Sequence, residues 1–408
     1  MGQSVAVAGQ QNGRTAFNIL VAISVCHFFN DTMQTLLPAI YPMLRSGLGL
    51  SFVQLGLITL VFQATGSFLQ PLIGRFTDQR PQPFSLPVGM SFTMAGILVL
   101  ASVHHYGLLL LGAALIGIGS SVFHPESSRL ARVASGGRFG LAQSVFQVGG
   151  NLGQSLAPLL VAFFVMPRGR GSLAWLAFLA LLGICLLTML GRWYRASGEA
   201  RPRPRRELNA PGPVGRKEAH RALAVLVALI FSKFFYLSSI TNYYIFYLMQ
   251  RFSLSAQSSQ VCLFAFLAAV ATGTLIGGPL GDRIGRKSVI WGSILGVLPF
   301  TLALPYAGLP LTIVLSIAVG LILSSAFSAI IVYGTELMPG RVGTISGLFF
   351  GLAFGIAGLG AALLGALADW TSIAFVYHVC AFLPAIGLLA FFLPDIGLDG
   401  RLRVRARA

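Results

Sequence analysis

The chain has 408 residues, of which 55% are hydrophobic and only 10% are charged. A soluble domain carries about 25% charged residues, so a chain this apolar cannot cover its surface in water and must be solvated by lipid. The net charge of +17 does not indicate a nucleic-acid partner, because Arg and Lys stand at the ends of apolar runs or in one central polar stretch.

Twelve apolar runs follow one another along the chain, and a membrane-spanning helix needs about 20 such residues. The first six runs cover residues 17–44, 52–73, 84–103, 107–124, 139–166 and 172–191. The other six cover residues 222–249, 257–280, 288–306, 310–333, 343–367 and 371–394. We therefore predict an all-α membrane protein with twelve transmembrane helices in two pseudo-symmetric bundles, residues 1–191 and 222–408.

The stretch 192–221 between the two sets of runs is rich in Pro, Arg and Gly and has no apolar stripe, which predicts a solvated linker. Basic residues gather on the cytoplasmic side of membrane proteins. If the helices alternate, the linker side holds most of the 28 basic residues. The opposite side holds only Arg45, Arg168, Arg170 and Arg251. We expect the linker and both termini, including the basic tail, to be cytoplasmic.

The two predicted bundles share a sequence repeat. Gly74-x-x-x-Asp78 follows the second run, and Gly278-x-x-x-Asp282 follows the eighth run, half the chain length later. Repeated six-helix halves are typical of one large class of secondary transporters, whose substrate sites lie between the halves near the bilayer midplane. We therefore expect the substrate site between the two bundles.

The loop from Gly278 to Lys287 reads Gly-Pro-Leu-Gly-Asp-Arg-Ile-Gly-Arg-Lys and resembles the signature loop of the major facilitator superfamily. In the first copy, Gln79, Pro81 and Pro83 replace the expected Arg, Gly and basic residues. We expect these loops and the adjacent charges to latch one conformation of an alternating-access cycle. The predicted latch consists of Gly74, Asp78, Glu126, Arg129, Gly278, Asp282, Arg283, Arg286, Glu336 and Arg341. A plain cytoplasmic anchor is the alternative.

Four stretches resemble the fosmidomycin-resistance branch of this superfamily. They are His27–Pro38, Phe123–Arg129, Gln143–Asn151 and Tyr333–Arg341. The resemblance implies an exporter of drugs and other small molecules in the cytoplasmic (inner) membrane of a bacterium, working in exchange for protons. It does not identify fosmidomycin as the substrate.

Asp31 is an acidic residue in the middle of the first run, where a charge costs at least about 2.5 kcal/mol. His27 and Gln34 share its helical face. A buried carboxylate can take up a proton on one side of the membrane and release it on the other. We predict that Asp31 couples protons to transport with His27 as helper. A structural hydrogen-bond node is the alternative.

Other polar residues inside the runs are candidates for substrate contact. Lys233 lies within the seventh run and precedes three tyrosines on one face, a combination that suits an anionic or aromatic substrate, although its long side chain could instead reach the interface. Amide side chains can bind varied ligands or join helices. The predicted substrate-binding residues are Gln34, Gln63, Gln143, Gln147, Asn151, Lys233, Tyr236, Tyr243 and Tyr247.

The sequence lacks a phosphate-binding G-x-x-x-x-G-K-[ST] loop, the zinc motif H-E-x-x-H and the serine motif G-x-S-x-G. We therefore predict no enzyme activity, no catalytic residues, no cofactor and no metal. The expected partners are a small-molecule substrate, protons and the lipid bilayer, and we expect a monomer. Two alternatives remain, namely a proton-coupled uptake symporter for a sugar or organic anion, and a membrane-embedded enzyme or lipid-binding scaffold.

Overall fold

The computed structural model describes residues 15–79, 82–136, 139–197, 214–338 and 342–395. Within these ranges the chain forms helices and no strand. The first half contains α1 Phe17–Ala39, α2 Tyr41–Leu48, α3 Phe52–Gln79, α4 Ser85–Ala101, α5 Tyr106–Ala134, α6 Phe139–Leu160, the π-helix η1 Val161–Val165, α7 Met166–Arg168, the 3₁₀ turn η2 Arg170–Ser172 and α8 Leu173–Ala196.

The second half repeats this pattern with more interruptions. It contains α9 Arg216–Phe252, α10 Ala256–Ile284, α11 Arg286–Leu295, α12 Leu298–Ala303, the 3₁₀ turn η4 Leu304–Tyr306, α13 Leu309–Ser324, α14 Ala326–Leu337, α15 Val342–Trp370, α16 Ile373–Cys380 and the 3₁₀ segment η5 Leu383–Phe392. Pro299, Pro305 and Pro384 lie at the starts of three of the short segments, where the missing N–H of proline does least harm.

Ten spans in the described residues are long and apolar enough to cross a membrane. The helix α4 is apolar but shorter. The helix α1 has 23 residues, with the polar residues Asn30, Asp31, Thr32 and Gln34 near its middle. The two complete a set of twelve, which confirms the predicted fold class.

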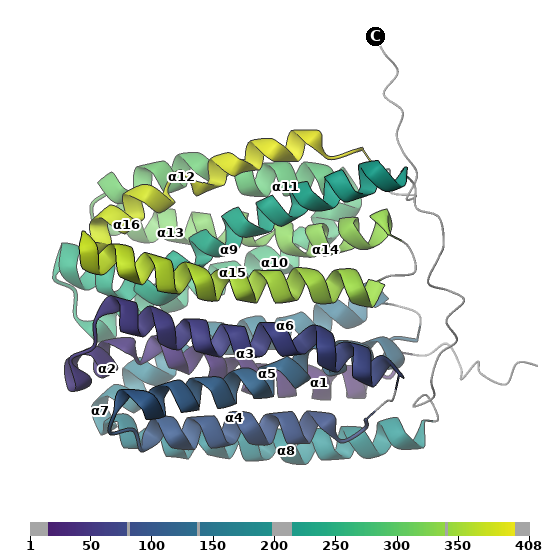
Figure 1. Ribbon diagram of the computed structural model, residues 1–408, viewed down its shortest axis with the longest axis horizontal. Helices are drawn as coiled ribbons and strands as arrows, with labels where there is room; N and C mark the ends of the chain where they lie inside the picture. Colours follow the sequence, from purple (N-terminus) through teal and green to yellow (C-terminus); the bar gives the residue numbers. More distant parts are fainter. Residues whose placement is uncertain (1–14, 80–81, 137–138, 198–213, 339–341, 396–408) are drawn as a thin grey trace, which may run out of the picture.

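The twelve spans form two bundles that run side by side (Figure 1). Helices α1 to α8 make one bundle and α9 to η5 the other. The boundary between them is formed mainly by α3 against α15 and by α6 against α10. Residues from the two ends of the sequence therefore meet in the middle of the molecule, as expected for a site between two repeated halves.

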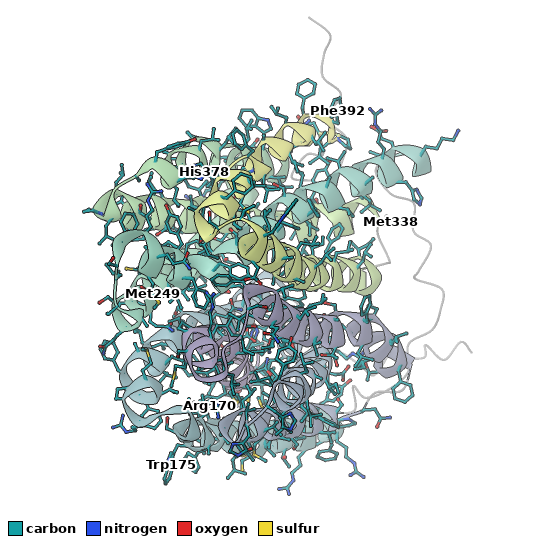
Figure 2. All side chains as sticks on the ribbon, turned by 60° about the vertical axis from the view of Figure 1, so that its left-hand side comes forward. Arg170, Trp175, Met249, Met338, His378 and Phe392 are labelled. Atoms are coloured by element: carbon teal, nitrogen blue, oxygen red, sulfur yellow. The ribbon has the colours of Figure 1, made fainter. Side chains whose placement is uncertain are left out.

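Large apolar side chains cover the outside of both bundles. Trp175 and Phe392 project from opposite edges of the molecule (Figure 2), and both are more than half exposed. An exterior of this kind would be a liability in water but is the expected surface in hydrocarbon. The outer surface therefore agrees with a chain solvated by lipid.

The two ends of the molecule are called the linker end and the far end. The linker end is where α8 finishes at Ala196 and α9 begins at Arg216. Both helices extend into the stretch 192–221 predicted as linker, because hydropathy marks the hydrocarbon boundary whereas Arg and Lys continue a helix readily in water. The far end is where α3 begins and α15 finishes.

Helices α3 and α15 approach each other most closely towards the far end. A Cβ atom added at Gly56 would lie only 2.4 Å from the carbonyl oxygen of Ala361, so the two backbones are in direct contact there. Nearer the linker end, a Cβ at Gly351 would lie 3.5 Å from the carbonyl oxygen of Ser67, which is ordinary contact. The two bundles are therefore held together more tightly at the far end.

Candidate proton and substrate sites

Asp31 lies in the middle of α1, and only 4% of its surface is exposed. His27 is one turn earlier, with Nε2 3.3 Å from Oδ2 of Asp31. The His27 ring stacks on Phe146 of α6 at 4.0 Å between centroids, and its Nδ1 donates to the Phe146 carbonyl oxygen at 2.8 Å. The helical spacing of four residues thus joins the two side chains, and α6 holds the imidazole in place.

Three amide side chains donate hydrogen bonds to the Asp31 carboxylate. Nε2 of Gln154 on α6 lies 2.7 Å from Oδ2. Nδ2 of Asn30 lies 3.0 Å and Nε2 of Gln34 lies 3.4 Å from Oδ1. The orientation of the Gln34 amide is set by Ser120 of α5, whose hydroxyl donates to Gln34 Oε1 at 3.2 Å. A carboxylate with several donors can remain ionised although it is buried.

His124 of α5 completes the cluster from a third helix. Its Nε2 lies 3.7 Å from Asp31 Oδ1, and its ring meets the His27 ring edge-on at 5.4 Å. On its other side the ring lies 5.4 Å from Phe354 of α15, which belongs to the opposite bundle. The cluster of His27, Asp31 and His124 therefore lies at the boundary between the bundles. Sequence reasoning did not assign His124 to this site.

Gly150 of α6 makes room for this cluster. A Cβ atom at this position would lie 2.4 Å from Cε1 and Nε2 of His27 and 2.9 Å from Asp31 Oδ2. One turn later, a Cβ at Gly153 would lie 2.3 Å from the carbonyl oxygen of Phe28. Glycines of this kind let membrane helices pack backbone to backbone. Here they bring α6 close enough for the Phe146 carbonyl group to bond His27 and for Gln154 to bond Asp31.

The ligand atoms of His27, Asp31 and His124 lie within 4.8 Å of one another, a spacing that could also surround a divalent cation. However, the carboxylate is already engaged by three amide donors. A divalent cation beside one carboxylate would leave a net positive charge within the membrane, whereas a single proton leaves the pair of His27 and Asp31 neutral. The arrangement is therefore better suited to binding a proton.

The remaining amides predicted to contact substrate are spread over α3 and α6. Gln63 is half-buried and faces Gly358 of α15 across the bundle boundary. Gln147 and Asn151 are half-buried on α6, and Nδ2 of Asn151 has no hydrogen-bond acceptor among the described residues. The side chain of Gln143 lies outside the described residues. Among these predicted substrate-binding amides, Asn151 therefore has an amide group that could donate a hydrogen bond to a substrate.

Lys233 of α9 is buried, with 2% of its surface exposed. Its Nζ lies 3.4 Å from the carbonyl oxygen of Ser324, 5.1 Å from the ring centroid of Phe327 and 5.5 Å from that of Phe234. No carboxylate pairs with it in the part of the chain that the structure describes. A buried ammonium with so little compensation is costly, which makes it a candidate to bind an anionic group.

A row of phenylalanine rings connects Lys233 with the proton cluster. Phe327 lies 5.2 Å from Phe350, and Phe350 lies 6.4 Å from Phe354, between ring centroids. Phe354 in turn contacts His124 across the bundle boundary. The row, called the aromatic wall, runs from Lys233 to the proton cluster. Such a wall suits a small ligand with an apolar part.

The three tyrosines predicted to contact substrate are all buried inside the second bundle. The hydroxyl of Tyr243 donates to the carbonyl oxygen of Ala361 at 2.5 Å, and the ring of Tyr247 stacks on Tyr377 at 4.2 Å. Tyr236 is 2% exposed. Phenylalanines, rather than these tyrosines, flank Lys233, so a role of the tyrosines in substrate binding stays a prediction.

Two ion pairs of the predicted latch occur near the linker end, one in each bundle. Arg129 lies 3.4 Å from Glu126, and it also donates to the carbonyl and hydroxyl oxygens of Thr77. In the second bundle, Arg286 lies 3.0 Å from Glu336. These contacts tie neighbouring helices of one bundle together. The first pair lies within α5, whereas the second joins α11 to α14, so the two pairs are not repeats of one another, and the latch stays a prediction.

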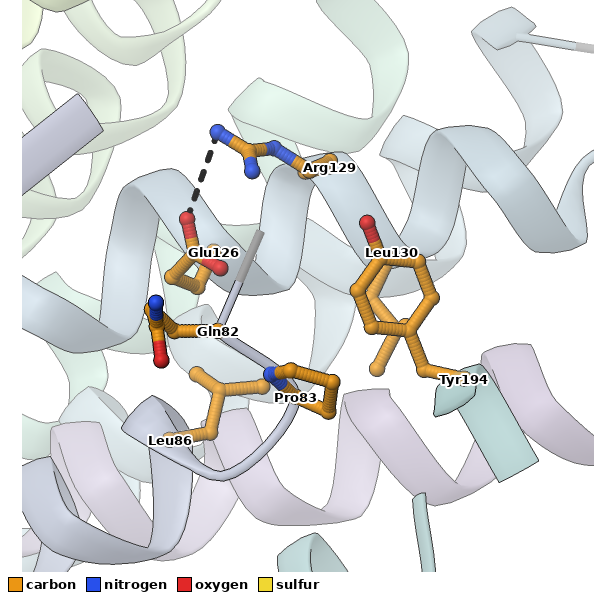
Figure 3. A pocket seen from close by; sticks show the side chains of 7 residues that line it. All are labelled: Gln82, Pro83, Leu86, Glu126, Arg129, Leu130 and Tyr194. Carbon is orange, nitrogen blue, oxygen red and sulfur yellow. Dashed lines mark ion pairs between the residues drawn. The ribbon is translucent and has the colours of Figure 1, made fainter. Parts of the chain in front are cut away.

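Arg283 is the one other predicted latch residue whose burial the structure describes. Arg283 is exposed. The side-chain positions of Gly74, Asp78, Gly278, Asp282 and Arg341 lie outside the described residues. Figure 3 shows a small pocket beside the Glu126–Arg129 pair, lined by Gln82, Pro83, Leu86, Glu126, Arg129, Leu130 and Tyr194. None of the proton cluster or the aromatic wall lines it, so this pocket is not our candidate substrate site.

At the far end, an acidic residue of one bundle caps a helix of the other. The Asp369 carboxylate, at the end of α15, accepts hydrogen bonds from the backbone N–H groups of Phe52 at 2.9 Å and Val53 at 2.7 Å, at the start of α3. The first N–H groups of a helix have no partner within it and attract anions. The sequence analysis missed Asp369, although an acid at the end of an apolar run was a visible signal.

Two further hydrogen bonds join the bundles in the same half of the molecule. The Gln260 amide donates to the carbonyl oxygen of Ala39, and Thr59 donates to Asn242 at 2.7 Å. Among the described residues, the side-chain hydrogen bonds between the bundles are these two and the Asp369 cap. They agree with the close approach of α3 and α15 there, and together they form a far-end latch.

Replacing Asp369 with alanine is expected to favour opening of the far end. Loss of a helix cap costs about 1 kcal/mol, which changes the ratio of open to closed molecules about fivefold. Nitroxide labels at Gly47 and Ser258, both exposed at the far end, would report the separation of the bundles. Asp369→Asn is the matched control, since asparagine also caps helices well. An unchanged distance distribution in Asp369→Ala would show that the cap does not help to keep the far end closed.

Two repeated six-helix bundles with buried polar groups at their boundary define a secondary transporter. The chain belongs to the Major Facilitator Superfamily, whose family model matches residues 23–259 and 227–403. It is 58% identical over 391 residues to the fosmidomycin resistance protein of Escherichia coli strain K12, covering 96% of both chains. These matches confirm the family resemblance identified from the sequence motifs.

Two other comparisons agree with this assignment. The chain is 41% identical over 396 residues to an uncharacterized MFS-type transporter, YfnC, of Bacillus subtilis strain 168, covering 97% of this chain and 96% of that protein. A crystal structure of the fucose:proton symporter of E. coli superposes with a TM-score of 0.65 at 14% identity, covering 94% of this chain and all of the other. At that identity the likeness shows the fold alone. The protein is thus a multi-pass membrane transporter of a small molecule.

Proposed function

We propose that the protein exports small drug-like or amphipathic molecules in exchange for protons by alternating access. The observation that carries the proposal is the buried cluster of His27, Asp31 and His124 at the bundle boundary, where a proton site can sense the separation of the halves. The name of the E. coli relative supports efflux of drugs rather than uptake. The linker end faces the cytoplasm of a bacterium in this proposal, because the basic residues gather there.

In the proposed cycle, substrate enters from the linker end and contacts the aromatic wall between the proton cluster and Lys233. The far-end latch then breaks, the substrate leaves, and a proton enters from that side. The proton is released into the cytoplasm after the halves rock back. The cycle needs one proton site and one substrate site that share the boundary, and the ring contacts from Phe327 to His124 supply that connection. It works as a monomer.

Replacing Lys233 with methionine is expected to separate binding from folding. Methionine has a similar length without the charge, so thermal stability should be unchanged or higher once the buried ammonium is gone. Affinity for an anionic substrate should fall about tenfold or more, because a hydrogen bond to a charged group contributes about 1.5–3 kcal/mol. Binding and melting curves of the purified variant test both parts. A stability loss with unchanged affinity would show that Lys233 is structural.

The proposed function is tested by comparing cells that express or lack the protein. A panel of antibacterial compounds, fosmidomycin among them, should include some to which expressing cells become resistant. In everted membrane vesicles, an imposed proton gradient should drive those compounds in the direction opposite to proton flow. Flux in the same direction as protons would favour the uptake symporter instead. The absence of any substrate-dependent flux would favour the membrane-embedded enzyme or scaffold.

A further inference from the structure

The hydrogen bonds of the buried imidazoles indicate which atom holds the coupling proton, an inference that rests on the proton coupling proposed above. Nδ1 of His27 lies 2.8 Å from the carbonyl oxygen of Phe146. A carbonyl oxygen only accepts hydrogen bonds, so Nδ1 must carry a hydrogen. The nitrogen that faces Asp31 is therefore Nε2, and its protonation is the open question.

Nε2 of His27 lies 3.3 Å from Oδ2 of Asp31, and both side chains are at least 95% buried. With no proton on either atom, the nitrogen lone pair would face a carboxylate oxygen where no water screens the repulsion. One proton on either atom turns the contact into an attractive one. Nε2 has no hydrogen-bond partner among the described residues, and a proton on it would give this buried nitrogen a charge complementary to the carboxylate.

The amide groups around the carboxylate decide between the two atoms. Gln154 donates to Oδ2, and Asn30 and Gln34 donate to Oδ1, so both oxygens act as acceptors. Hydrogen bonds donated to a carboxylate stabilise its ionised form, and a protonated carboxyl has fewer acceptor sites, so three amide donors favour ionised Asp31. We infer that His27 carries the coupling proton as an imidazolium, while Asp31 stays ionised as its counter-charge.

His124 is the second proton acceptor of the cluster. Its Nδ1 lies 3.2 Å from the carbonyl oxygen of Ser120, so its Nε2 also faces Asp31, at 3.7 Å from Oδ1. Of the described groups facing His27, α5 contributes His124 as a titratable side chain and α1 contributes Asp31. The contacts from α6 are a carbonyl group, an amide and ring atoms, which do not titrate.

The position of His124 indicates that the proton moves between His27 and the bundle boundary by way of His124. Its ring contacts Phe354 of the opposite bundle, whereas the His27 ring is enclosed by Phe146 and Phe123 of its own bundle. During exchange the N–H bond at His27 Nε2 breaks and an N–H bond forms at His124 Nε2, with Asp31 compensating the positive charge in both positions. His27 stores the proton, and His124 passes it to the space between the bundles.

Infrared difference spectroscopy of the protein in lipid bilayers, cycled between high and low pH, tests this inference. Acidification should produce imidazolium bands that disappear in His27→Gln. It should produce no carboxylic acid carbonyl band that disappears in Asp31→Asn. A carbonyl band lost in Asp31→Asn would overturn the inference and place the proton on the carboxylate. Acidification bands unchanged in His27→Gln would overturn it as well.

A second measurement needs no variant that has to fold. Magic-angle-spinning NMR of the wild-type protein with isotope-labelled histidine distinguishes imidazolium from neutral imidazole. We expect one buried histidine to be an imidazolium with an Nδ1–H bonded to a carbonyl, and only neutral buried imidazoles would contradict this. Vesicle transport by the wild type separates the two levels of the argument. If protons drive no transport, the proposed function fails; if they do and the carboxylate titrates, only this inference fails.

Discussion

Replacing Asp31 with asparagine is expected to abolish proton-driven transport while leaving the fold intact. Asparagine has the same shape and can still accept hydrogen bonds from Gln154, but it cannot balance a positive charge on His27. Removing one partner of a buried charge pair costs about 3–5 kcal/mol, so proton binding at His27 should weaken about 10²-fold or more. Uptake into everted vesicles under an imposed pH gradient should therefore fall to the level of vesicles without the protein.

The matched control is Asp395→Asn, because Asp395 is an exposed carboxylate outside the proton cluster. This control should transport like the wild type. Equilibrium binding of substrate by Asp31→Asn should persist, since the residue acts on the energy source rather than on the substrate. Wild-type coupling in Asp31→Asn would exclude Asp31 from the proton site.

Replacing Gly150 with alanine is the second change with a large expected effect. The new methyl group would lie 2.4 Å from ring atoms of His27, far inside van der Waals contact. The ring cannot simply turn away, because it is stacked on Phe146 and hydrogen-bonded to its carbonyl oxygen. We expect His27 to separate from Asp31, with at least tenfold slower proton-driven transport and a lower melting temperature.

Gly292→Ala is the control for this substitution. Gly292 lies in α11, and a Cβ there would meet nothing within 4 Å. Because alanine favours helix over glycine by about 1 kcal/mol, the control should be as stable as the wild type or more so. Equal transport by Gly150→Ala and Gly292→Ala would show that the close approach of α6 is not needed for coupling.

The sequence predicted the twelve spans well because lipid imposes one rule on all of them. Apolar length marks the hydrocarbon, but it does not mark where a helix ends. The run 17–44 is divided in the structure into α1 and α2, which meet beside Pro42. The run ending at residue 124 continues as α5 to Ala134, because its polar last turns remain helical outside the apolar stretch.

Only the contacts of the candidate site that lie within one helix could be predicted from the sequence. Helical spacing placed His27, Asp31 and Gln34 on one face of α1, and the structure shows them in contact. The spacing could not show that α5 and α6 bring His124 and Gln154 to the same carboxylate, because those contacts span about a hundred residues of sequence. Tertiary packing also surrounds Lys233 with phenylalanines, which local spacing could not indicate.

The two sides of the Asp369 cap differ in how easily a mutation removes them. Its two donors are main-chain N–H groups, and nearly every amino acid at positions 52 and 53 would keep them, proline being the exception. Its acceptor, in contrast, is a single side chain, which most substitutions at position 369 remove, asparagine being an exception. Substitutions that loosen the far-end latch should therefore arise at position 369 far more often than at positions 52 and 53. Sequencing variants selected for altered transport would show this difference.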